Sequence, residues 1–110
     1  MNQMFKELFI RKVEKFIPLM TLEDLKSAKD SEGIGADGVS IAVAILWLRD
    51  RKKKTHSFRN KRSLSKMIRW LKSEMRSYMD FGSWDPFVGD VCKRIYTLMY
   101  EKRLREQEND

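Results

Sequence analysis

The stretch that decides the fold runs from Val39 to Leu48 and reads VSIAVAILWL. Nine of its ten residues are apolar, and Ser40 is the exception. A helix with apolar side chains on every side is stable only when other helices surround it. Asp37, just before the stretch, is a good capping residue. The stretch therefore predicts a central hydrophobic helix over about 38–53.

Two helical patterns precede this central helix. Apolar residues recur at three- and four-residue spacing from Phe5 to Ile17, and Pro18 should end that helix because the residue before a proline avoids helical geometry. Thr21 can cap a second helix, with Asp24 as the reciprocal acid of a capping box. We expect these helices to bury Phe5, Leu8, Phe9, Val13, Phe16, Ile17, Leu22, Leu25 and Ala28.

Two longer patterns follow the central helix. One runs from Ser63 to about Asp80 and stops at Gly82. The other begins with Asp85 as the cap and Pro86 at the first helical position, where the missing N–H does no harm. The inward-facing residues expected here are Leu64, Met67, Ile68, Leu71, Met75, Tyr78 and Met79, then Phe87, Val88, Val91, Cys92, Ile95, Leu98 and Met99.

These patterns together predict an all-α fold, a compact bundle of four to five helices around the central one. No segment alternates in the way that a half-buried strand requires. We expect residues 1–100 to form a single helical domain. Residues 101–110 are nearly all charged or polar and predict a helical tail that frays.

The composition is typical of a cytoplasmic protein. A chain of 110 residues can bury a core without disulfides, and its single cysteine, Cys92, can form neither an intrachain disulfide nor a C-x-x-C pair. The N-terminus has no apolar run of the kind found in signal peptides. The longest apolar run, 41–48, is far shorter than the roughly 20 residues that span a bilayer. We therefore expect no membrane partner.

The segment 33–38 reads GIGADG and matches the G-x-G-x-x-G pattern of dinucleotide-binding loops. Such a loop needs a preceding strand and an acid about twenty residues on. Here a helical pattern precedes the segment, and Asp37 would place a carboxylate where the pyrophosphate binds. The segment also lacks the Lys of a phosphate loop and the bidentate Glu of a calcium loop. It favours a flexible connection between helices.

The sequence predicts no enzymatic activity, no cofactor, no metal site and no small-molecule substrate. His56 is the only histidine and lies among cations, with no carboxylate nearby to orient it as a base. Cys92 falls on the inner side of its helix, as free cysteines commonly do. Glu23 and Asp24 are neighbours and point about 100° apart on a helix, so they do not share a metal in the usual way.

The charge is concentrated in one segment. Of the 23 basic residues, 12 lie between Arg49 and Arg76, where only Asp50 and Glu74 are acidic. The segment carries a local charge of +10 and the rest of the chain −3, which the net charge of +7 conceals. Two or three cations would complement the dipole at the end of the central helix, but the excess continues beyond it. Such self-repulsion favours a surface that binds a polyanion.

The fourth helix arranges its cations on one side. At 100° per residue, Lys66, Arg69, Lys72 and Arg76 flank the apolar stripe as a single face, and we expect no acid within one turn to neutralise it. Trp70 lies beside Lys66, where it either contacts a ligand or is covered by the first helix or the tail. The predicted site, including the polar connection 55–62, comprises Arg51, Lys52, Lys53, Lys54, Arg59, Lys61, Arg62, Lys66, Arg69, Trp70, Lys72 and Arg76.

Two functions fit this basic face. The first is nucleic-acid binding, to DNA or RNA, largely through phosphates. The second is a protein-interaction module, such as a small inhibitor or adaptor, that docks on an acidic protein surface. The segment holds six Arg and six Lys, which favours neither. A DNA-binding helix-turn-helix needs a turn of three to four residues, and both predicted connections are longer.

Overall fold

The computed structural model describes residues 3–30 and 38–108. These residues are almost entirely helical and include no strand, so the predicted all-α bundle is confirmed. The predicted cap Asp37 and most of the glycine-containing segment, 33–37, lie outside the described residues. The elements are α1 (Gln3–Phe16), η1 (Ile17–Leu19, a 3-10 helix), α2 (Leu22–Asp30), α3 (Gly38–Lys54), α4 (Phe58–Phe81) and α5 (Phe87–Glu108).

Helix α3 is the centre of the bundle, as its apolar sequence predicts. Its residues from Ile41 to Leu46 are all buried, and it packs against α1, α4 and α5. Ser40, the polar exception in the stretch, is also buried, and its Oγ accepts a hydrogen bond from the Tyr96 hydroxyl at 3.1 Å. That bond removes the cost of placing a polar group in the core. None of the described helices is both long and apolar enough to cross a membrane.

The predicted helix ends are confirmed where a cap defines them. The Thr21 N–H donates to Asp24 Oδ2 at 2.8 Å, and the Asp24 N–H donates to Thr21 Oγ1 at 3.1 Å, which completes the capping box of α2. The Phe87 N–H donates to Asp85 Oδ1 at 2.9 Å at the start of α5. Gly82 ends α4 with φ of 68°, a conformation that glycine adopts without strain.

The start of α4 differs from the prediction. The helix begins at Phe58, not at Ser63, so the predicted connection 55–62 is wrong and only residues 55–57 join α3 to α4. Ser57 caps the helix, because its Oγ accepts a hydrogen bond from the Asn60 N–H at 3.3 Å. The first turn of α4 is exposed and has a single apolar residue, Phe58, so it carries no apolar periodicity that would reveal it as helix.

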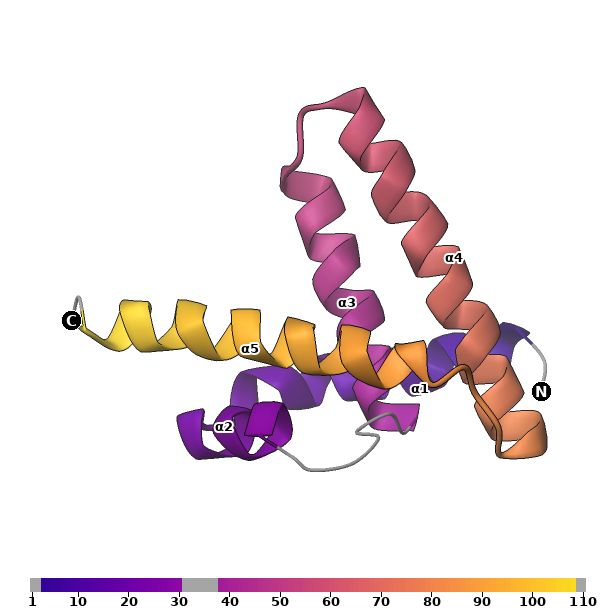
Figure 1. Ribbon diagram of the computed structural model, residues 1–110, viewed down its shortest axis with the longest axis horizontal. Helices are drawn as coiled ribbons and strands as arrows, with labels where there is room; N and C mark the ends of the chain where they lie inside the picture. Colours follow the sequence, from indigo (N-terminus) through magenta and orange to yellow (C-terminus); the bar gives the residue numbers. More distant parts are fainter. Residues whose placement is uncertain (1–2, 31–37, 109–110) are drawn as a thin grey trace.

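This short connection removes the loop length as a reason to exclude a helix-turn-helix, but the arrangement of the helices is different. Figure 1 shows α3 and α4 running antiparallel, with the connection at the far end from the other helices. Helix-turn-helix pairs instead cross at about 90–120°. We call the α3–α4 pair the basic hairpin. Helix α5 lies across its base, and α2 packs along α5 (Figure 1).

The buried face of α1 also differs from the prediction. Phe5, Leu8 and Phe16 are at least half exposed, whereas Ile10 and Lys6 are buried. The helix is therefore rotated by roughly 70° about its axis relative to the predicted face. The same kind of difference occurs at Phe87, which is 60% exposed although we expected it to face inward. Apolar periodicity marks a wide face, and the packing partners select the part of it that is buried.

The charged end of α5 remains helical to Glu108. Arg103, in the predicted tail, donates a hydrogen bond from its guanidinium to the carbonyl oxygen of Met20. Leu104 is partly buried. This part of the predicted tail therefore contacts the body of the protein.

Candidate polyanion-binding surface

The basic hairpin carries all twelve cations of the basic segment, and most of them are not neutralised. Four form ion pairs with described residues: Arg49, Lys54, Lys72 and Arg76. The remaining eight have no ion pair within 3–30 and 38–108: Arg51, Lys52, Lys53, Arg59, Lys61, Arg62, Lys66 and Arg69. Since the hairpin extends away from the other helices, its far end is open to a large ligand (Figure 1).

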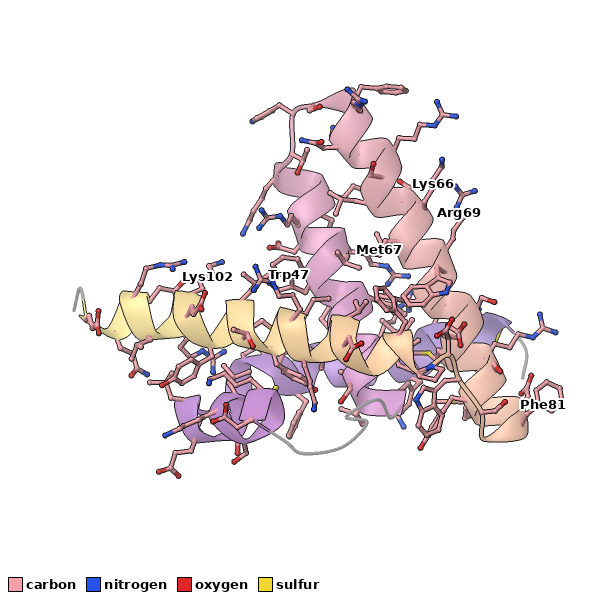
Figure 2. The ribbon with its side chains drawn as sticks, in the orientation of Figure 1. Trp47, Lys66, Met67, Arg69, Phe81 and Lys102 are labelled. Atoms are coloured by element: carbon pink, nitrogen blue, oxygen red, sulfur yellow. The ribbon has the colours of Figure 1, made fainter. Side chains whose placement is uncertain are left out.

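Four of these cations form one line along α4, which we call the outer stripe: Arg59, Arg62, Lys66 and Arg69. At 100° and 1.5 Å per residue they fall within a sector of about 80° and extend over about 15 Å. All four are exposed. Figure 2 shows Lys66 and Arg69 pointing away from the rest of the molecule. Arg59 and Arg62 belong to this line because α4 begins at Phe58.

A groove between α3 and α4 brings further cations together. It has a volume of about 470 Å³ and is lined by Arg49, Lys52, Lys53, Lys61 and Lys72, with Ile68 as its apolar member. Lys52, Lys53 and Lys61 are among the cations without an ion pair in the described part of the chain. The groove adjoins the outer stripe around α4, so anions can approach the hairpin on two sides.

The other two cations of the groove have a structural role. Glu7 of α1 lies between them, with its Oε1 at 3.1 Å from both Arg49 Nη2 and Lys72 Nζ. Burial acts to raise the pKa of Glu7, but hydrogen bonds from Lys72 and Arg49 outweigh it, and the pKa lies below its ordinary value. Lys6 beside it is 8% exposed, and burial, then Lys72 and Arg76, lower its pKa. Glu7 therefore holds α1 against the base of the hairpin.

We expect Glu7→Gln to destabilise the protein by about 1–3 kcal/mol near neutral pH, because it leaves Arg49 and Lys72 without their shared anion. The folded-state pKa of Glu7 is lowered, so its contribution is present above the unfolded-state pKa and lost as the pH falls through the folded-state value. The stability difference between variant and wild type should accordingly shrink below about pH 4. Urea denaturation across pH measures both effects.

Glu14→Gln is the matched control for this prediction. Glu14 is exposed on the same helix and forms no ion pair with the described residues. Its replacement should change stability by no more than about 0.5 kcal/mol. Equal effects of the two substitutions would contradict the role assigned to Glu7.

Three more predicted site residues, Lys54, Arg76 and Trp70, each interact with another side chain of the protein. Lys54 pairs with Asp50 at 3.0 Å and Arg76 with Asp80 at 3.6 Å, each across four residues of a helix. The expectation that no acid within one turn neutralises the face is therefore wrong at Arg76. Trp70 is partly buried against the core, with its ring centroid 6.2 Å from that of Phe87.

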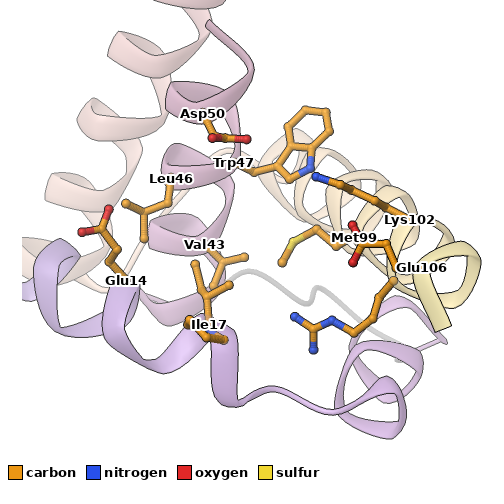
Figure 3. Close-up of a pocket in the computed structure, with 11 residues that line it drawn as sticks. Glu14, Ile17, Val43, Leu46, Trp47, Asp50, Met99, Lys102 and Glu106 are labelled. Carbon is orange, nitrogen blue, oxygen red and sulfur yellow. The ribbon is translucent and has the colours of Figure 1, made fainter. Parts of the chain in front are cut away.

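Sequence reasoning missed a group of residues on the α5 side of the hairpin. Trp47, although part of the central stretch, is only partly buried. Figure 3 shows its indole extending from α3 toward α5, next to Lys102. Arg51 lies over the indole ring, with its guanidinium carbon 5.1 Å from the ring centroid. Lys102 and Arg105 of α5 complete this group. No local signal connects residues so far apart in the sequence.

Comparisons of the chain with protein-family models, with curated proteins and with solved structures find no match. The geometry and charge of the hairpin are therefore the features from which a function can be inferred. Neither residue considered for nucleophilic or acid–base chemistry has a catalytic setting: Cys92 is buried in the core, and His56 is exposed within the connection 55–57, among cations. In the described residues no three metal-ligating side chains gather.

Proposed function

We propose that this protein binds nucleic acid, DNA or RNA, mainly through phosphates, and that it has no enzymatic activity. The contact surface is formed by the end of α3, the connection 55–57 and α4. The observation that carries the proposal is a set of eight cations on one protruding hairpin that form no ion pair with the described residues. A phosphate backbone supplies closely spaced negative charges, about one per 1.7 Å of duplex axis, and can relieve this repulsion along its whole length.

The shape of the surface supports nucleic acid over an acidic protein. The outer stripe is linear and extends over about 15 Å of α4. The groove places Lys52, Lys53 and Lys61 on a second side of the same hairpin. A duplex presents phosphates on both sides of a groove, whereas a compact acidic protein patch contacts one side of a projecting element.

Binding to duplex DNA and to structured RNA should show weak sequence preference and strong salt dependence. If about five phosphates are contacted, the logarithm of the binding constant falls with the logarithm of the salt concentration at a slope near −4.5. The affinity should then fall roughly 500-fold from 50 to 200 mM salt. Fluorescence anisotropy with labelled nucleic acid measures the slope. No binding to either polymer at 50 mM salt would favour an acidic protein partner instead.

A further inference from the structure

Trp47 interrupts the burial of the central stretch. Its neighbours Leu46 and Leu48 are buried, whereas Trp47 is only partly buried. Its side chain lines three separate hollows where α5 crosses the hairpin. A large aromatic ring that is only partly buried loses some of the stabilising free energy that full burial would give. Tryptophans in such positions are common in binding sites. The ring is therefore available to a ligand.

One of these hollows is basic, and we call it the Trp47 hollow. It has a volume of about 340 Å³, and its lining includes Trp47, Asp50, Arg51, Lys54, Lys102 and Arg105. The lining includes four cations and one acid, so its net charge is +3. The acid is Asp50, which pairs with Lys54 at 3.0 Å. The two cations of α5, Lys102 and Arg105, form no ion pair with the described residues.

The combination of groups identifies the ligand class. The indole is an apolar face on which a planar ring can stack, and the Arg51 guanidinium already lies over it. The cations of α5 suit phosphate groups. A carboxylate-bearing peptide would use the cations but leave the aromatic ring without a partner. A planar base joined to phosphates uses both, as in proteins that bind single strands.

We propose that the Trp47 hollow binds an unpaired nucleotide, with its base stacked against the Trp47–Arg51 pair and its phosphates held by Lys102 and Arg105. The hollow adjoins the basic hairpin through Arg51 and Lys54. This proposal extends the proposed function and rests on it, because a strand whose phosphates contact the hairpin can place one unpaired base in the hollow. The protein should accordingly bind strands with bases more tightly than strands of equal charge without them.

The test compares single strands that differ only in their bases. A thymidine DNA strand and a uridine RNA strand of about twelve nucleotides are titrated with the wild-type protein, each beside an abasic strand of the same sugar and length. We expect at least one of the two base-bearing strands, DNA or RNA, to bind about 5- to 150-fold more tightly than its abasic counterpart. The salt slopes should be alike, because the phosphates are the same in number.

Variants assign the preference to the hollow. Trp47→Ala should abolish the preference for bases, and Trp47→Phe should keep part of it. Thermal melting checks that both variants remain folded, since Trp47 packs partly against the core. Lys102→Gln combined with Arg105→Gln leaves the core untouched and should reduce the salt slope for single strands by about 1.4.

Two results would overturn the assignment: equal affinity for base-bearing and abasic strands, or a preference for bases that persists in Trp47→Ala. Binding of duplex DNA through the outer stripe would survive both results, so the proposed function would stand. A protein that binds neither duplex nor single strands at low salt would fail the proposed function itself.

Discussion

Ile45→Ala is expected to lower the free energy of unfolding by about 2–5 kcal/mol. Ile45 lies in the middle of α3 and has no solvent exposure. Removing its outer carbons loses their transfer free energy and leaves a cavity that the surrounding helices can fill only in part. Natural domains are stable by about 5–15 kcal/mol, so this single change removes a large share of the total. Chemical denaturation followed by circular dichroism measures it.

Val39→Ala on the same helix is the control. Val39 is 42% exposed, so its truncation removes little buried surface. The expected change is about 0.5 kcal/mol or less. If Ile45→Ala proves as mild as Val39→Ala, α3 is not the centre of the core.

The features that the sequence predicted correctly are those specified by neighbouring residues. Nine apolar residues in ten identify α3 as buried whatever surrounds it. The capping box of Thr21 and Asp24 and the cap at Asp85 each involve residues within three positions of one another. Such local hydrogen bonds define where a helix begins before any tertiary contact exists.

The start of α4 was missed although a local signal was present. Ser57 is a preferred capping residue, and neither glycine nor proline interrupts the chain from Ser57 to Phe81. The prediction relied on apolar periodicity, and the first turn of α4 has none because it projects beyond the core. The consequence is functional, since the earlier start aligns Arg59 and Arg62 with Lys66 and Arg69.

Other features depend on packing between distant segments. Glu7 and Arg49 are 42 residues apart, and their contact at 3.1 Å sets which side of α1 faces the hairpin. Lys72 joins the same anion from α4. The Trp47 hollow likewise combines α3 with cations of α5 more than fifty residues later. A single sequence contains no spacing rule for such contacts.

Reversing two charges of the outer stripe should weaken nucleic-acid binding on the order of 100-fold at 0.1 M salt. Arg62 and Arg69 are exposed and have no ion pair in the described part of the chain, so Arg62→Glu with Arg69→Glu removes phosphate contacts without breaking a structural interaction. The magnitude of the salt slope should fall by about 1.8 because two counterion-releasing contacts are lost. Thermal stability should change little and can rise, since like-charge repulsion decreases.

The matched control changes the net charge equally at a distance from the hairpin. Lys12→Glu with Lys26→Glu alters exposed residues of α1 and α2 that form no ion pair with the described residues. Lys102 and Arg105 are unsuitable because they line the Trp47 hollow. If the outer stripe is a positioned binding surface, only the α4 double variant should lose affinity for nucleic acid, and the control should stay within a few-fold of wild type. The reason is that attraction between distant charges is screened over about 10 Å at this salt concentration. Equal losses from the two pairs would mean that net charge alone attracts the polyanion, and the outer stripe would then have no specific role.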